Sequence, residues 1–153
     1  MNIYEKLDKA RESIRNTPLK KTASGGMFKY FTPEEVESLV AEACSEMGLL
    51  PICSLKRNEF GLYQEMRLID MEAGVGEEDL PMSYIVFELA TEKGSLKNTN
   101  ESQNMGSTDT YSERYIKMKV FQIKDNNLDP DGQQSHDKDK SVTPAVTNNG
   151  YKI

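Results

Sequence analysis

The chain of 153 residues lacks tryptophan and contains one histidine and two cysteines. A tetrahedral Cys/His zinc site needs four such ligands, so one subunit cannot form it. Cys44 and Cys53 stand among apolar residues, which favours buried free thiols over a disulfide or a catalytic nucleophile. His136 stands in a polar segment without apolar neighbours. We therefore expect a solvated side chain there rather than a catalytic base.

Long apolar segments are missing as well. No stretch of the sequence approaches the roughly 18 apolar residues of a membrane span, and no apolar signal-peptide core follows the charged start. We therefore expect a cytoplasmic protein without a membrane partner. A length of 153 residues suits a single domain, because domains usually run to about 100–200 residues.

Nucleotide-binding motifs are absent too. The glycine-containing segment 74–78, GVGEE, is acidic and has no Lys-Ser/Thr pair after it, so it cannot hold phosphates as a P-loop does. Glu77 and Asp79 could together bind Mg²⁺, but a solvated loop is the favoured interpretation. We therefore expect no enzyme activity, no metal and no cofactor.

Charge is distributed unevenly along the chain. The formal net charge of −6 is unusual for a protein that binds nucleic acid, but residues 1–33 carry seven Lys/Arg against three Asp/Glu, and residues 93–124 carry six against three. The middle, 34–92, carries three against fourteen. If the fold brings the two basic segments together, they form a cationic stripe of the kind found in strand-binding proteins. Unrelated solvated faces are the alternative.

Apolar residues at helical spacing predict two helices in the first third of the chain. Residues 2–15 form the first, with Asn2 as its N-cap. A Lys- and Gly-rich connector, 19–29, follows it. The segment TPEE beginning at Thr32 is a capping-box start with proline at the first helical position. This second helix is expected to end at Gly48.

The remainder predicts an α+β fold, in which a three-stranded antiparallel meander packs with helices. Period-two apolar patterns predict strands at 50–56, 60–70 and 82–91, joined by a tight connection at 57–59 and an acidic loop at 74–81. A polar segment, 93–104, leads to a helix at 107–123. Residues 126–153 have almost no apolar content, which predicts a disordered acidic and polar tail after a core domain of residues 1–125.

The segment 103–132, QNMGSTDTYSERYIKMKVFQIKDNNLDPDG, is the most informative part of the sequence. We interpret it as a loop, a helix and an acidic exit. In the helix, Tyr111 and Tyr115 share one face, while Arg114 and Lys117 share another. A loop and helix that offer amides, hydroxyls and cations on their outer side suit a phosphate backbone.

This segment resembles the signature of the Erf (essential recombination function) family. The residues that stand in the order and spacing of that signature are Asn104, Gly106, Thr110, Tyr111, Arg114 and Tyr115. Met105 replaces the usual leucine, and Glu113 replaces an arginine that many relatives carry. Upstream, MNIYEKLDKAR and LKKTASGGMFKYFTPEEV are similar to the family's opening helix and its approach to the second helix. MGLLPICSL is similar to the exit into the first strand, and the resemblance covers residues 1–132.

The resemblance implies a phage or prophage recombination protein that binds single-stranded DNA and anneals complementary strands without ATP. It also implies the β-β-β-α core of annealing proteins and a homo-oligomeric ring or filament. In that assembly a cationic groove holds the backbone and leaves the bases exposed. A host single-strand binding protein is a further partner in this interpretation.

With the resemblance, eight residues are expected to contact DNA: Lys20, Lys21, Lys29, Tyr30, Lys97, Asn104, Arg114 and Lys117. The alternative is that the aromatic residues pack in the core and the lysines are merely exposed. Tyr111 and Tyr115 are expected to pack against the sheet. Gly106 is expected to allow a close approach or an unusual backbone dihedral before the helix.

Two other classes of function stay open. One is a protein-binding adaptor of the same fold that recruits a host recombination or replication factor; the acidic tail, Glu113 and the net charge favour it. The other is an accessory enzyme of a nuclease, for which the sequence offers no catalytic set. A gel shift with labelled oligonucleotides separates the adaptor from the annealing protein.

Overall fold

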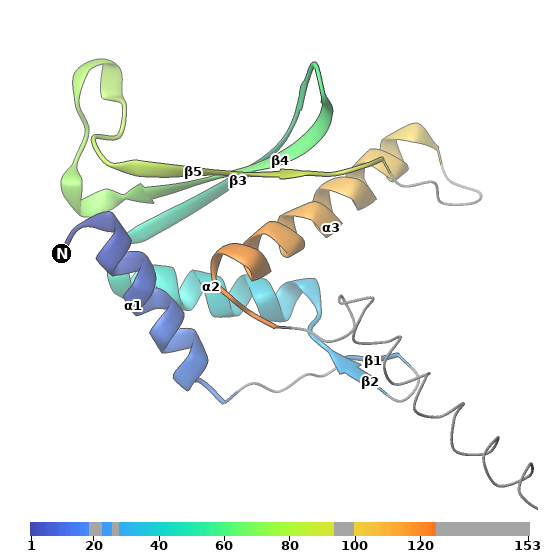
Figure 1. The fold of residues 1–153 in the computed structure, drawn as a ribbon, viewed down its shortest axis with the longest axis horizontal. Helices are drawn as coiled ribbons and strands as arrows, with labels where there is room; N and C mark the ends of the chain where they lie inside the picture. Colours follow the sequence, from blue (N-terminus) through green and yellow to red (C-terminus); the bar gives the residue numbers. More distant parts are fainter. Residues whose placement is uncertain (19–22, 26–27, 94–99, 125–153) are drawn as a thin grey trace, which may run out of the picture. The chain divides into compact units, whose positions relative to one another are not determined.

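The computed structural model describes residues 1–18, 23–25, 28–93 and 100–124, with the backbone alone for 23–25 and 28–30. These residues form two parts, which we describe separately. The larger part holds three helices and a three-stranded sheet (Figure 1). The smaller part holds a two-stranded hairpin. The expected tail lies outside the described residues.

Helix α1 spans Ile3–Asn16. The Asn2 side chain accepts hydrogen bonds from the backbone N–H groups of Tyr4 and Glu5, both at 3.0 Å, and the Glu5 carboxylate accepts the N–H of Asn2 at 2.8 Å. This capping box satisfies donors that the start of a helix leaves open, and it confirms Asn2 as the N-cap. The buried residues of the helix are Ile3, Lys6, Leu7, Ala10 and Ile14.

Helix α2 spans Pro33–Met47 and begins and ends as predicted. Thr32 Oγ1 accepts the N–H of Glu35 at 3.2 Å, and the Glu35 carboxylate accepts the N–H of Thr32 at 2.7 Å. The helix ends at Gly48, whose φ of 66° is the left-handed conformation that glycine adopts without strain. Its buried residues are Val36, Val40, Ala43 and Cys44.

Helix α3 spans Glu101–Val120, so the predicted start near residue 107 is wrong by about two turns. The cause is a third capping box. Asn100 Oδ1 accepts the N–H of Gln103 at 2.8 Å, and the Gln103 side chain accepts the N–H of Asn100 at 3.1 Å. The expected loop before Gly106 is therefore helical from residue 101, while residues 94–99 lie outside the described ranges.

The sheet is an antiparallel meander in the order β3-β4-β5. Its strands are β3, Leu49–Asn58, β4, Gly61–Asp70, and β5, Tyr84–Ala90. Asn58 pairs with Gly61, so the turn lies at Glu59 and Phe60 rather than at 57–59. Two short 3₁₀ helices, Met71–Ala73 and Glu77–Asp79, occupy the exposed connection between β4 and β5. Three antiparallel strands with three helices confirm the α+β class.

The expected connector after α1 contains a small hairpin instead of continuous loop. Strand β1, Ala23–Gly25, pairs antiparallel with β2, Phe28–Tyr30. Ala23 lies opposite Tyr30, and Gly25 lies opposite Phe28. Two three-residue strands cannot be stable alone, because an isolated hairpin is at best marginally stable in water.

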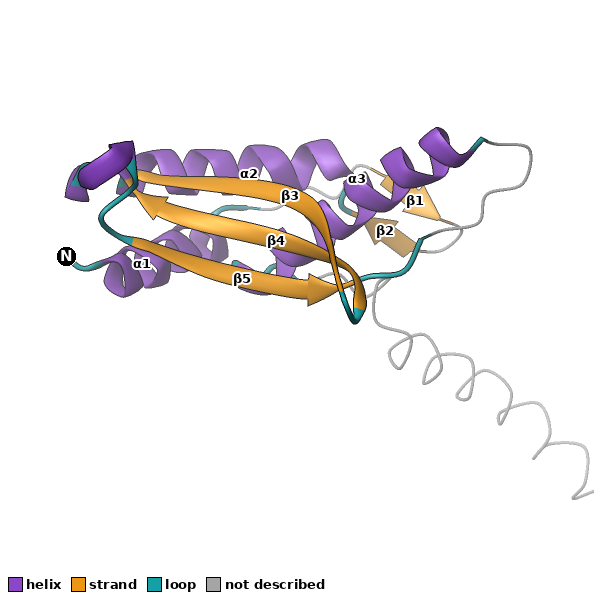
Figure 2. Ribbon diagram, turned by 90° about the horizontal axis from the view of Figure 1, so that it is seen from above, coloured by secondary structure: helices purple, strands orange, loops and turns teal. Residues whose placement is uncertain are grey.

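In the larger part, all three helices lie on one face of the sheet (Figure 2). The inward residues of the sheet include Met66 and Leu68, which are fully buried. The opposite face carries no helix in the described part of the chain. The strand register places four exposed apolar residues on that face: Leu50, Ile52, Tyr84 and Val86. None of the described helices is long and apolar enough to cross a membrane.

Candidate nucleic-acid interface

One face of α3 is hollowed where it passes the start of α2. Two adjoining cavities of about 550 and 220 Å³ share Pro33, Thr110 and Arg114 in their walls. The larger is completed by Gln103, Gly106, Ser107 and Tyr111. We call this continuous hollow the α3 groove. Most of its α3 residues recur at intervals of three and four, which places them on one face of the helix.

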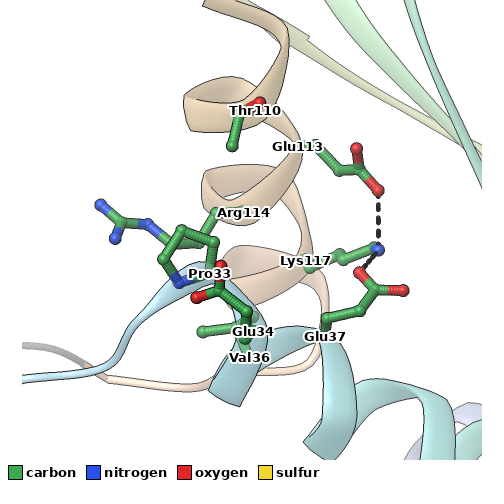
Figure 3. Close-up of a pocket in the computed structure, with 8 residues that line it drawn as sticks. All are labelled: Pro33, Glu34, Val36, Glu37, Thr110, Glu113, Arg114 and Lys117. Atoms are coloured by element: carbon green, nitrogen blue, oxygen red, sulfur yellow. Dashed lines mark hydrogen bonds and ion pairs between the residues drawn. The ribbon is translucent and has the colours of Figure 1, made fainter. Parts of the chain in front are cut away.

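The two ends of the α3 groove differ in charge. The larger cavity is lined by an amide, two aliphatic hydroxyls, a phenol and a guanidinium, and none of its described lining residues is acidic. The smaller cavity is lined by the carboxylates of Glu34, Glu37 and Glu113 beside Lys117 (Figure 3). An anionic ligand is therefore favoured in the larger cavity next to Arg114 and repelled beyond it.

Gly106 leaves the helix backbone accessible from the α3 groove. Apart from the neighbouring residues and backbone of α3 itself, a Cβ atom placed on it would meet no described atom within 4 Å. Among the described glycines, positive φ occurs at Gly48, Gly61 and Gly74, and Gly106 is inside a regular helix. The expectation that Gly106 serves a close approach within the fold or an unusual dihedral is therefore wrong. Glycine inside a helix costs about 1 kcal/mol relative to alanine, and no contact within the described chain requires it.

Arg114 is half-buried at the point where the two cavities meet. Its Cζ lies 5.8 Å from the ring centroid of Tyr111, one turn earlier, within the range of a cation–π interaction. The prediction that Arg114 lies on the side away from Tyr111 is therefore wrong. Figure 3 shows its side chain extending away from the carboxylates of Glu37 and Glu113. Tyr111 lines the larger cavity and not the smaller one, so its contact with Arg114 places the guanidinium beside the larger cavity.

Lys117 is buried, with a side chain only 5 % exposed. Its ammonium donates hydrogen bonds to Glu113 at 2.8 Å and to Glu37 (Figure 3). Burial lowers the pKa of Lys117, but the hydrogen bonds to the two carboxylates outweigh that effect and raise it above its usual 10.5. The expectation that Lys117 lies on an outer, exposed face is therefore wrong. The two carboxylates neutralise the Lys117 ammonium, so it attracts a phosphate group only weakly.

Tyr111 and Tyr115 stack on each other, with ring centroids 5.9 Å apart and planes 20° apart. Tyr115 is half-buried, but Tyr111 is 51 % exposed, so the expected packing against the sheet does not hold for Tyr111. Both rings line a third cavity, of about 430 Å³, between α3 and the β3–β4 hairpin. We call it the tyrosine pocket. Tyr111 also lines the α3 groove, so it is the wall that the two hollows share.

Six other residues are predicted to contact DNA, and the side chains of five of them are not described. Lys20, Lys21 and Lys97 lie outside the described residues, and for Lys29 and Tyr30 only the backbone of β2 is described. Asn104 is half-buried in the second turn of α3, where its carbonyl accepts the Thr108 hydroxyl at 2.8 Å. It is not among the groove-lining residues. These six assignments stay predictions.

The two cysteines are free thiols. Cys44 is buried and Cys53 is half-buried, which confirms the expectation of free thiols over a disulfide. Burial raises the pKa of each to about 12, and the nearby charge of Lys117 opposes this only partly. Both thiols therefore stay protonated at neutral pH and are poor nucleophiles.

No group of three or more His, Cys, Asp or Glu residues within the described ranges is arranged to hold a metal ion. Glu77 and Asp79, the candidate magnesium ligands, lie in an exposed 3₁₀ turn. The larger cavity of the α3 groove thus offers hydrogen-bond donors and one guanidinium. That chemistry suits the binding of an anion through its oxygens.

The sequence of this chain matches a known protein family over nearly its whole length. The model of the ERF superfamily matches residues 3–152, nearly the whole chain. The chain belongs to the ERF superfamily. ERF membership makes it a recombination protein of the phage annealing type and implies nucleic-acid binding in general. Neither the curated proteins nor the solved structures give a match.

The ERF signature residues fall on α3, and the fold sorts them into two groups. Gly106, Thr110, Tyr111 and Arg114 line the α3 groove, whereas Asn104 and Tyr115 do not. Gln103 and Ser107 also line the groove, although sequence reasoning did not select them. A helix start at residue 101 would have placed both on the face of Thr110. The missed signal was the Asn-x-x-Gln capping pattern at 100–103.

Proposed function

We propose that this ERF protein binds single-stranded DNA in the α3 groove. The observation that carries the proposal is the composition of the larger cavity, where an amide, two hydroxyls and the Arg114 guanidinium line a hollow without described carboxylates. Phosphate oxygens accept hydrogen bonds from these groups. The open helix backbone at Gly106 lets a strand approach closely.

A single strand fits the site better than a duplex does. Tyr111 stands exposed at the edge of the α3 groove, and an aromatic ring can stack on an unpaired base. The bases of a duplex are already stacked in pairs and are not available to that ring. The combination of phosphate-binding groups with an exposed aromatic ring is typical of proteins that hold unpaired strands.

We further propose that the bound strand is annealed to its complement without ATP. A single α3 groove reaches only a few phosphates, so a long strand requires several subunits side by side. The exposed apolar face of the sheet, with Ile52, Tyr84 and Val86, is a candidate surface for that association, because apolar patches commonly mark protein contacts. A strictly monomeric protein would favour the adaptor function instead.

Replacing Arg114 tests the proposed groove. Arg114→Ala should weaken binding of a labelled mixed-sequence strand roughly tenfold at low salt, because one charge-assisted contact to phosphate is lost. The slope of log affinity against log salt should become shallower by about 0.7, the value for one phosphate of a single strand. Arg15→Ala is the matched control, since Arg15 is exposed in the last turn of α1 and outside the groove.

Thermal unfolding of the same variants separates binding from folding. Arg114→Ala should change the free energy of unfolding by less than about 1 kcal/mol. A variant that binds the strand as the unchanged protein does would remove Arg114 from the interface. A large drop in melting temperature with unchanged affinity of the folded fraction would instead assign Arg114 a structural role.

A further inference from the structure

The residues that line the tyrosine pocket suit a flat, neutral, aromatic group. Tyr111 and Tyr115 form one wall, and Phe60, 89 % exposed at the tip of the β3–β4 hairpin, stands at its edge. Leu62 and Leu89 add apolar surface. The volume of about 430 Å³ lies within the range of small-molecule sites.

The polar groups of the pocket select against phosphate. Among the described lining residues the charged one is Glu92, and its carboxylate repels an anion. Thr91 adds a hydroxyl. The Ser112 hydroxyl, by contrast, is buried and donates to Gln64 and to the Thr108 carbonyl. The Glu92 carboxylate and the Thr91 hydroxyl can hydrogen-bond the edge of a nucleobase, which carries amino and carbonyl groups. The tyrosine pocket thus disfavours an anion, whereas the larger cavity of the α3 groove favours one.

Their shared wall joins the two hollows into one composite site. Tyr111 lines both, and the Arg114 Cζ is 5.8 Å from the centre of its ring. One nucleotide can therefore place its phosphate beside Arg114 and its base against the tyrosine rings. A base stacked on an aromatic side chain gains roughly 1–3 kcal/mol.

We propose that the tyrosine pocket holds one unpaired nucleobase of the strand whose phosphates lie in the α3 groove. This inference rests on the proposed function. Each subunit anchors one base through Tyr111, Tyr115 and Phe60 and leaves the neighbouring bases free to test a complementary strand. The pocket thereby holds one nucleotide of the strand at a defined place on each subunit.

The test compares two strands of equal length in fluorescence anisotropy. One carries normal bases of mixed sequence, and the other is abasic at every position. The unchanged protein should bind the normal strand about tenfold more tightly. Tyr111→Ala and Phe60→Ala should bring the two affinities together, whereas Tyr111→Phe should keep the difference. Tyr4→Ala is the matched control, because Tyr4 is an exposed tyrosine on α1.

The abasic strand also distinguishes base binding in the tyrosine pocket from phosphate binding in the α3 groove. Tyr111→Ala removes the ring next to Arg114, but any resulting loss of phosphate binding lowers affinity for both strands equally. Equal affinity of the unchanged protein for the two strands would overturn base binding in the tyrosine pocket, but it would be consistent with phosphate binding in the α3 groove. Failure to bind either strand would overturn the proposed function itself. If the affinities for the two strands still differed tenfold in both Tyr111→Ala and Phe60→Ala, base binding in the tyrosine pocket would also be overturned.

Discussion

At the scale of single residues, buried lysines show how this fold uses charge. In the described chain, Lys6 and Lys117 are both buried, and each donates to two carboxylates. The Lys6 ammonium lies 2.6 Å from Asp70 and 2.6 Å from Glu72, at the end of β4. Each lysine thus joins a helix to a partner element by a charge-assisted contact instead of facing a ligand.

Lys117→Met should lower stability rather than strand affinity. The substitution leaves the carboxylates of Glu37 and Glu113 without their cation, although both are partly exposed and can hydrate. We expect the free energy of unfolding to fall by about 1–3 kcal/mol. Lys119→Ala is the control, since Lys119 is exposed two residues further on. Chemical denaturation measures the first effect, and anisotropy of the folded protein should show unchanged affinity.

Asp70 gives the protein a defined sensitivity to acid. The hydrogen bond from Lys6 holds the pKa of Asp70 below its usual 3.8, and burial only partly opposes it. The carboxylate therefore contributes stability above about pH 4, and that contribution is lost as the pH falls through its lowered pKa in the folded state. In Asp70→Asn, unfolding monitored between pH 6 and pH 2 should depend less on pH. An unaltered pH profile would contradict the pairing.

At the scale of elements, the helix starts of α1 and α2 could be predicted because their signals are local. Asn2 and Thr32 each stand three residues before a glutamate, and both pairs form capping boxes. The start of α3 carries an equivalent pattern at Asn100, but the first turns of that helix have no apolar stripe to draw attention to it. The α3 groove could not be predicted, because it exists only where Pro33 of α2 packs near α3.

Gly106→Ala should separate the stability of α3 from its function. Apart from the neighbouring residues and backbone of α3 itself, no described atom lies within 4 Å of the added methyl group, so the helix should gain about 0.5–1 kcal/mol of stability. The same methyl group projects into the α3 groove and should weaken strand binding. The melting temperature and the strand affinity, measured on one preparation, should therefore move in opposite senses. A more stable variant with unchanged affinity would remove Gly106 from the interface.

At the scale of the whole molecule, the described ends of the two basic segments meet. The side chains of Lys20, Lys21, Lys29 and Lys97 lie outside the described residues, so the cationic stripe stays a prediction. Arg11 of α1 donates to the carbonyl of Val120 at the end of α3, at 2.8 Å. Lys6 and Lys117 are neutralised by carboxylates inside the fold. A count of charges along the sequence could not reveal this, because it does not show which cations are buried in ion pairs. Among the described residues, the larger cavity of the α3 groove therefore relies on neutral donors and Arg114 to bind phosphate.

The affinity of the unchanged protein for single-stranded and double-stranded DNA, measured from low to physiological salt, tests the central claim most directly. We predict tighter binding of the single strand than of a duplex of equal length, and an affinity that falls as salt rises, because cations are released from the phosphates. Equal or tighter binding of the duplex would contradict the proposal that Tyr111 stacks on unpaired bases. An affinity independent of salt would contradict phosphate binding in the α3 groove.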